Sequence, residues 1–188
     1  MDWFLKLVRI AGVNFPGAAS LVQLQAEIDS EAINISIKKL SDPISFLNMD
    51  VQKVSREIYK KLKANNSDVL CFSDEFYSKY SKSLAALDSK KLIKKIVTAD
   101  SRFPKFITLP DASFVIYMCK LDEDHKKMTR ITSIVDSCEY GTCLDGYALS
   151  KQFELPVYVI RSIFSIYESK GYGILSNARG TCQYVGRS

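Results

Sequence analysis

Apolar residues recur every three or four positions over most of this 188-residue chain, a spacing typical of amphipathic helices. Near the start, Trp3, Phe4, Leu7 and Ile10 share one such stripe. This stripe predicts a helix over residues 2–12 with an apolar face that must be covered, either by the rest of the chain or by a partner.

Further stripes of the same spacing follow, several of them bounded by capping or helix-ending residues. Asp50 is a plausible N-cap and Asn65-Asn66 a plausible end for one helix, and Ser73-Asp74-Glu75 caps the next. The predicted helices cover residues 20–41, 50–65, 75–92, 112–121, 123–138, 147–154 and 157–169.

Two segments have a different pattern. Residues 93–111 alternate and are broken between Asp100 and Pro104, which predicts two short strands around a loop. Residues 172–188 predict a terminal pair of strands. The expected fold class is therefore mainly α with short antiparallel β-hairpins, an α+β protein.

The segment KQFELPVYVIRSIFSIYESKGYG, residues 151–173, contains the end of one predicted helix, a turn at Leu155-Pro156, and the whole of the next helix. Side chains on the two sides of this turn are spaced to close over each other and hold the helices near a right angle. Gly171 then ends the second helix in a conformation that other residues dislike. The residues that carry this pattern are Leu149, Phe153, Leu155, Pro156, Ile160, Phe164, Tyr167, Glu168, Lys170, Gly171 and Tyr172, with a hairpin tip at 177–180.

This pattern resembles a winged helix-turn-helix domain over about the last 65 residues. A shorter similarity lies upstream, because LAALDSKKLI at 84–93 aligns with FSIYESKGYG at 164–173, a domain length further along the chain. Together they indicate tandem winged-helix-like units: a helical N-terminal extension over 1–48, a degenerate unit over 49–121, and a winged helix-turn-helix unit over 122–188. The first unit departs from the pattern, since DVLCFSDE leaves little room for a separate second helix.

Composition supports an ordinary soluble globular chain, with 47% hydrophobic and 25% charged residues. No apolar run reaches the ~18 residues that a membrane-spanning helix needs. Five cysteines at irregular spacing favour free thiols and a cytoplasmic location. Cys138 and Cys143 form one close pair, but zinc would also need Cys182 and His125, so we expect no metal and no cofactor.

The net charge of +5 is concentrated in the middle of the chain. Residues 51–110 contain thirteen Lys or Arg and six Asp or Glu, which gives 13 − 6 = +7. Such a block is either a solvated face or a surface for phosphate. The candidate phosphate-binding lysines are Lys79, Lys82, Lys90, Lys91, Lys94 and Lys95.

The resemblance implies that the outer side of the helix over 157–169 enters a DNA major groove. The residues on that side that could contact bases or phosphates are Tyr158, Arg161, Ser162 and Ser165. Lys151 could contact the DNA backbone, and Arg179 at the hairpin tip could contact a phosphate or the minor groove. Val157, Val159 and Ile166 add apolar surface that suits a protein partner better.

Catalytic signatures are weak. The chain has one histidine, His125, in a highly charged run, and it lacks the common nucleophile, phosphate-loop and metalloprotease motifs. We therefore expect a protein that is not an enzyme.

Two hypotheses follow from these patterns. The first is a DNA-binding regulator or accessory factor. The alternative is a protein–protein adaptor, whose partner-binding residues are Trp3, Phe4, Leu7, Ile10, Val157 and Ile166. A homodimer through the helix over 20–41 is a third arrangement that the pattern permits.

Overall fold

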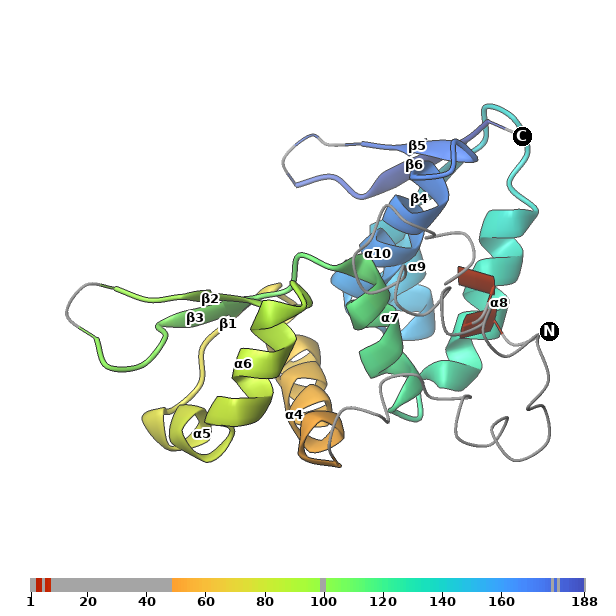
Figure 1. Cartoon of the computed structure of the whole chain (residues 1–188). Helices are drawn as coiled ribbons and strands as arrows, with labels where there is room; N and C mark the ends of the chain where they lie inside the picture. The colour runs from red at the N-terminus through yellow and green to blue at the C-terminus, as the bar shows by residue number, and fades with distance from the viewer. Residues whose placement is uncertain are drawn as a thin grey trace, which may run out of the picture.

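The computed structural model describes residues 3–4, 6–7, 49–98, 101–176, 178 and 180–187 (Figure 1). Within these residues lie the helices α4 to α10 and two antiparallel sheets of three strands each. The predicted α+β class is confirmed, although each hairpin is completed by a third strand. The predicted helix over 20–41 lies outside the described residues.

The unit predicted over 49–121 contains the elements α4 to β3, called the first unit from here on, and a further helix at its end that is described separately below. The elements of the first unit are α4 (Met49–Asn65), β1 (Val69–Leu70), α5 (Asp74–Lys79), α6 (Ser81–Ser89), β2 (Lys94–Ile96) and β3 (Phe106–Thr108). The strands lie in the order β1-β3-β2. Helix α4 forms where its apolar stripe predicts, because Val54, Ile58 and Leu62 are completely buried in the core.

The prediction of one helix over 75–92 is wrong, because the chain turns at Tyr80 and forms α5 and α6. Ser73 caps α5 as expected, accepting a hydrogen bond from the Phe76 N–H at 3.3 Å. The Tyr80 ring packs on Phe76 with ring centroids 5.1 Å apart. The turn therefore keeps the apolar spacing continuous, and periodicity could not reveal it. The first unit has a separate second helix after all.

The second unit repeats this order of elements. It consists of α8 (His125–Asp136), β4 (Cys143–Asp145), α9 (Gly146–Phe153), α10 (Val157–Glu168), β5 (Gly173–Leu175) and β6 (Gln183–Gly186). Its strands lie in the order β4-β6-β5, which matches the first sheet. Strands β1 and β4 were missed by the sequence analysis because two or three residues are too few to show alternation.

An equivalent hydrogen bond is present at the end of the third helix of each unit, which is α6 in the first unit and α10 in the second. The Asp88 carboxylate accepts from the Lys95 N–H at 3.3 Å, and the Glu168 carboxylate accepts from the Leu175 N–H at 2.9 Å. Each acid therefore joins its helix to the following strand. Asp88 and Glu168 also occupy the same position in the two aligned sequence segments, so the similarity seen in the sequence is a structural correspondence.

The turn after each third helix is also the same. Lys91 and Gly171 occupy corresponding positions and have left-handed backbone conformations, with φ of 59° and 78°. In both turns the N–H of the next residue donates a hydrogen bond to a carbonyl in the last turn of the helix. The Leu92 N–H donates to the Leu87 carbonyl at 3.0 Å, and the Tyr172 N–H donates to the Tyr167 carbonyl at 3.2 Å. This is the helix end that Gly171 predicted.

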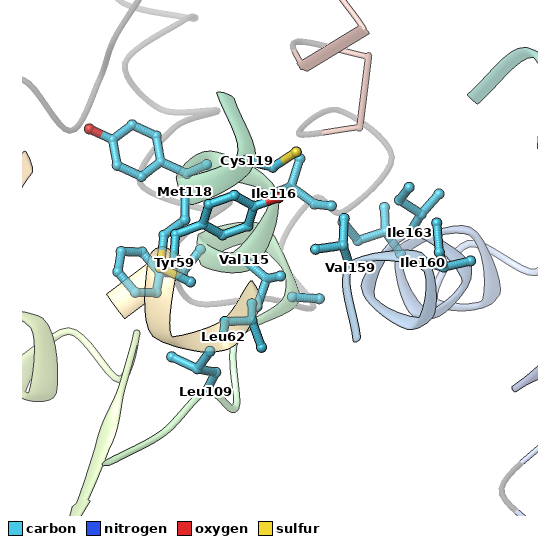
Figure 2. Close-up of a cluster of buried hydrophobic side chains, with 14 of the residues drawn as sticks. Tyr59, Leu62, Leu109, Val115, Ile116, Met118, Cys119, Val159, Ile160 and Ile163 are labelled. Atoms are coloured by element: carbon cyan, nitrogen blue, oxygen red, sulfur yellow. The ribbon is translucent and has the colours of Figure 1, made fainter. Parts of the chain in front are cut away.

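Helix α7 (Ala112–Lys120) lies between the units. Asp111 caps it by accepting from the Phe114 N–H at 2.9 Å, and every residue from Ala112 to Cys119 is buried. Its most extensive contacts are with α10, and it also packs on α4. Figure 2 shows α7 side chains meeting Leu62 of α4 on one side and Val159 and Ile163 of α10 on the other.

A buried acid also joins the units. Asp124, at the start of α8, accepts from Lys63 Nζ at 2.7 Å and from the Tyr59 hydroxyl at 3.3 Å, both on α4. Lys127 lies 3.2 Å from its other oxygen. Burial opposes ionisation, but the two lysines outweigh it and hold the pKa of Asp124 below its ordinary value.

The apolar side chains of the N-terminal segment pack inside the chain. Trp3, Phe4 and Leu7 are helical and buried, and Lys120 Nζ lies 4.3 Å from the Phe4 ring centroid. Lys6 forms an ion pair with Asp136 of α8. The face over residues 2–12 is therefore covered by this chain as far as it is described, and Ile10 lies outside the described residues.

Candidate nucleic-acid interface

The third helix of the first unit, α6, has one open side. Leu84 and Leu87 are buried, whereas Lys82, Ala85 and Ser89 are exposed at the spacing of one helical face. This open face has few functional groups, because it carries one cation and two small side chains. It can approach a charged polymer closely but offers few groups that could distinguish bases.

Lysines surround this open face. Lys79 is exposed and lies 5.2 Å from the Tyr80 ring centroid, and Lys95 is engaged by Asp88 at 3.4 Å. Among the described residues, no carboxylate lies within ion-pair distance of the exposed lysines Lys82, Lys90, Lys91 and Lys94. The structure thus brings the six lysines of the sequence prediction onto α5, α6, the turn after α6 and β2, and four of them have no acidic partner within the described residues.

The hairpin of β2 and β3 adds cations that the sequence analysis missed. Arg102 and Lys105 are exposed between the two strands, each with its charged group 5.5 Å from the ring centroid of the following phenylalanine. The sequence could have indicated these two residues as candidate phosphate-binding groups, because both lie in the loop between two predicted strands. Over residues 79–105 the chain has eight Lys or Arg and two Asp, or 8 − 2 = +6. Figure 1 shows this hairpin extending away from the second unit.

The corresponding face of α10 is largely covered. Ser162 is buried, and Tyr158, Arg161 and Ser165 are half-buried. These four residues, which the sequence analysis assigned to DNA, come together around a small pocket of about 150 Å³ that Pro110 and Ala112 also line. A helix that reads a major groove must present an open side along its length. Helix α10 does not present one in this structure.

Hydrogen bonds fix the polar groups of this pocket. The Tyr158 hydroxyl donates to the Leu109 carbonyl at 2.6 Å, the Ser162 hydroxyl to the Tyr158 carbonyl at 2.8 Å, and Arg161 Nη1 to the Thr181 carbonyl at 2.9 Å. Burial raises the pKa of Tyr158 to about 12, so this phenol stays neutral and donating. Three of the four groups expected to contact DNA, those of Tyr158, Arg161 and Ser162, are therefore used for internal contacts.

The remaining predicted residues are scattered. Lys151 is exposed on α9, and Arg179 lies outside the described residues. Val157 is half-buried, and its N–H donates to the Asn66 side chain at 3.0 Å. Ile166 is buried, like Val159. The apolar side of α10 therefore contributes to the interior of the chain, and in this arrangement it is not an open partner-binding surface.

Two of the buried thiols are held in the protonated form. All five cysteines are free, and three of them, Cys119, Cys138 and Cys182, are buried. Burial raises the pKa of Cys119 to about 12 and that of Cys182 to about 11, so both stay protonated at neutral pH. Over the part of the chain that the structure describes, no three His, Cys, Asp or Glu side chains are placed to hold a metal ion.

In the described ranges, no helix has both the length and the apolar character needed to cross a membrane. Searches with family models, against curated proteins and against solved structures find no match to this chain.

Proposed function

We propose that this chain is a non-enzymatic DNA-binding accessory protein built from two winged-helix units, and that its first unit provides the DNA interface. The order helix, strand, helix, helix, strand, strand occurs in both units, and the first strand pairs with the last in each sheet. This arrangement supports the winged-helix interpretation that the turn at Leu155-Pro156 suggested. The shared helix-ending bonds of Asp88 and Glu168 support it further.

The observation that carries the proposal is the open, unpaired basic face of the first unit. Helix α6 presents Lys82 to solvent, and Lys90, Lys91 and Lys94 follow on the turn and on β2. A third helix that enters the major groove would bring the adjacent hairpin, with Arg102 and Lys105, against a neighbouring phosphate backbone. Because phosphate contacts dominate such an interface, its affinity depends weakly on DNA sequence and steeply on salt.

The covered face of α10 supports a division of labour between the units. The sequence of the second unit matches the winged-helix pattern better than that of the first unit. Its third helix, α10, nevertheless packs on α7 and holds the two units together (Figure 2). The first unit is the degenerate copy in sequence, yet its third helix is open. The proposed interface therefore lies on Lys79, Lys82, Lys90, Lys91, Lys94 and Lys95, with Arg102 and Lys105 added.

A fluorescence anisotropy titration with a duplex of about 20 base pairs tests this function. For about five phosphate contacts, we expect the affinity to fall roughly 500-fold between about 50 and 200 mM salt. Two duplexes of unrelated sequence should bind within about threefold of each other, because phosphate contacts carry no sequence information directly. Absence of binding at the lower salt concentration would remove the proposal.

An adaptor remains the second candidate, because the second unit exposes aromatic and apolar side chains. Tyr140, Tyr172 and Ile174 are 81%, 46% and 42% exposed. Ile174 pairs with Val185 across the sheet, and Val185 pairs with Cys143. The side chains of Ile174, Val185 and Cys143 therefore lie on one face of the sheet. A photo-crosslinking amino acid at position 174, compared with one at position 60, tests this candidate. A protein captured from position 174 alone would support it, and equal capture from both would exclude this surface.

A further inference from the structure

A pocket of about 430 Å³ lies between the first unit and the linker that leads into α7. Asp88 and Lys91 at the end of α6, Ile93 and Lys94 at the start of β2, and Pro110 and Asp111 of the linker line it. Figure 1 shows this linker running from β3 to α7 between the two units. The volume lies within the range of small-molecule binding sites.

Two carboxylates and two ammonium groups line the pocket, and with Lys95, which is paired with Asp88, the local charge is 3 − 2 = +1. Both carboxylates are already engaged: Asp88 with the N–H and the ammonium of Lys95, and Asp111 with the Phe114 N–H and the Ser113 hydroxyl. Lys91 and Lys94 are exposed, and no described acid pairs with them. Asp111 keeps its negative charge because the Phe114 N–H and the Ser113 hydroxyl are neutral donors, but Asp88 is offset by Lys95, and the remaining single positive charge favours an anionic occupant.

The backbone at Lys91 is a second, independent indication. Lys91 has a φ of 59°, in the left-handed region where a side chain is disfavoured. The corresponding turn of the second unit has Gly171 at this position, which avoids that cost. The first unit thus makes the same turn with a strained lysine, and that lysine lines the pocket. Strain retained at one residue is a reason to look for a use of its side chain.

The rest of the lining defines the chemistry further. Ile93 lies beneath the pocket and is 1% exposed, whereas Pro110 is exposed and offers apolar surface next to the two cations. A phosphate monoester has three strong acceptor oxygens, so one group can accept hydrogen bonds from both ammonium groups. We infer that this pocket binds a small aromatic phosphate ester, with the phosphate between Lys91 and Lys94 and the ring on Pro110.

The test uses the full ¹⁵N-labelled chain and two-dimensional NMR, with phenyl phosphate as the probe. We expect saturable shifts of the amide signals of residues 88–95 and 111. Inorganic phosphate and phenol, which each carry one half of the probe, should bind at least about tenfold more weakly. Binding of inorganic phosphate as tight as that of phenyl phosphate would overturn the inference, as would shifts spread over lysines outside the pocket.

Matched variants locate the site. Lys91→Gln should weaken phenyl phosphate binding about tenfold, whereas Lys90→Gln removes the same charge one residue away and should change it less than about twofold. Lys91→Gly should weaken binding equally while relieving the backbone strain, so unfolding cannot explain its loss. Equal effects of Lys90→Gln and Lys91→Gln would overturn the inference. Because the titration contains no DNA, its result does not depend on the proposed DNA-binding function.

Discussion

Helices α6 and α10 end in the same turn and the same acid-to-strand hydrogen bond, yet one is open and the other covered. The difference lies at two corresponding positions: α6 has the exposed Lys82 and the half-buried Ala86, where α10 has the buried Ser162 and Ile166. The neighbouring pair, Ser83 and Ile163, is buried in both helices. The two isoleucines give α10 a second apolar stripe, which is buried in the structure.

This comparison teaches that a shared topology does not fix which surface of a unit is available. The second apolar stripe of α10 requires a cover, and α7 packs on this helix more extensively than any other element does. Helix α6 has no such stripe, and its side with Lys82, Ala85 and Ser89 stays in solvent. Burial of apolar surface stabilises by about 25 cal/mol per Å², so the apolar Ile166 favours a covered side on α10 where α6 has only Ala86.

The largest expected effect on stability comes from placing a charge on the buried side of α10. Ile166→Lys places a charge where the native side chain is 1% exposed, and it should lower the free energy of unfolding by about 4 kcal/mol. Ala86→Lys, at the corresponding half-buried position of α6, should change it by less than about 0.5 kcal/mol. Urea unfolding followed by circular dichroism measures both. Similar losses in the two variants would show that the two helices do not differ in this way.

The next effect concerns the acid that joins the units. Asp124→Asn removes the charge-assisted bonds from Lys63 and Lys127 and should cost about 2 kcal/mol at pH 7. The adjacent exposed Glu123→Gln serves as the control.

Because the folded pKa of Asp124 is depressed, its contribution is present above the ordinary carboxyl pKa of about 4. That contribution is lost as the pH falls through the lower, folded pKa. The difference in stability between the native chain and Asp124→Asn should therefore shrink below about pH 4. A difference that stays constant down to pH 2 would contradict this role.

DNA affinity gives a third comparison. Replacing both Lys82 and Lys90 with Gln should weaken duplex binding about tenfold near 0.1 M salt, because both lysines are exposed and unpaired in the first unit. Arg161→Gln should change it less than about twofold, since this guanidinium already donates to the Thr181 carbonyl. Anisotropy titrations measure both. A larger effect of Arg161→Gln would return the interface to α10.

The smallest expected effect concerns the two helix ends. A Cβ at Gly171 would meet no atom within 4 Å, so Gly171→Ala should cost about 1 kcal/mol through its backbone conformation alone. Lys91→Gly should instead raise the free energy of unfolding by a net of about 0.5 kcal/mol, because the relief of backbone strain exceeds the entropy that glycine adds to the unfolded chain. Thermal unfolding checks both signs. A destabilised Lys91→Gly would mean that the lysine side chain contributes contacts that outweigh the strain.

Much of the fold was predictable because it depends on near neighbours. The stripe of Val54, Ile58 and Leu62 predicted α4, and the alternation over 93–111 predicted β2 and β3. The turn at Tyr80 was missed because its ring continues the apolar stripe. The short strands β1 and β4 were missed because each is defined by pairing with a strand that comes much later in the chain, β3 and β6 respectively.

The candidate site was only partly predictable for the same reason. Charge clustering found the lysines of the first unit, and the structure places them around one open helix face. The assignment of Tyr158, Arg161, Ser162 and Ser165 rested on which side of α10 is the outer one. Periodicity identifies a helix face, but it does not state what covers that face.

The amino-acid sequence alone determined most of the helices, the two hairpins, the basic middle and the similarity between two related helix ends. These features follow from spacing, capping and turn residues that act over a few positions. Only the tertiary structure decided that α7 covers α10 and leaves α6 open, and that Trp3, Phe4 and Leu7 pack inside the chain. Those outcomes depend on apolar faces that lie far apart in sequence and meet only when the chain has folded.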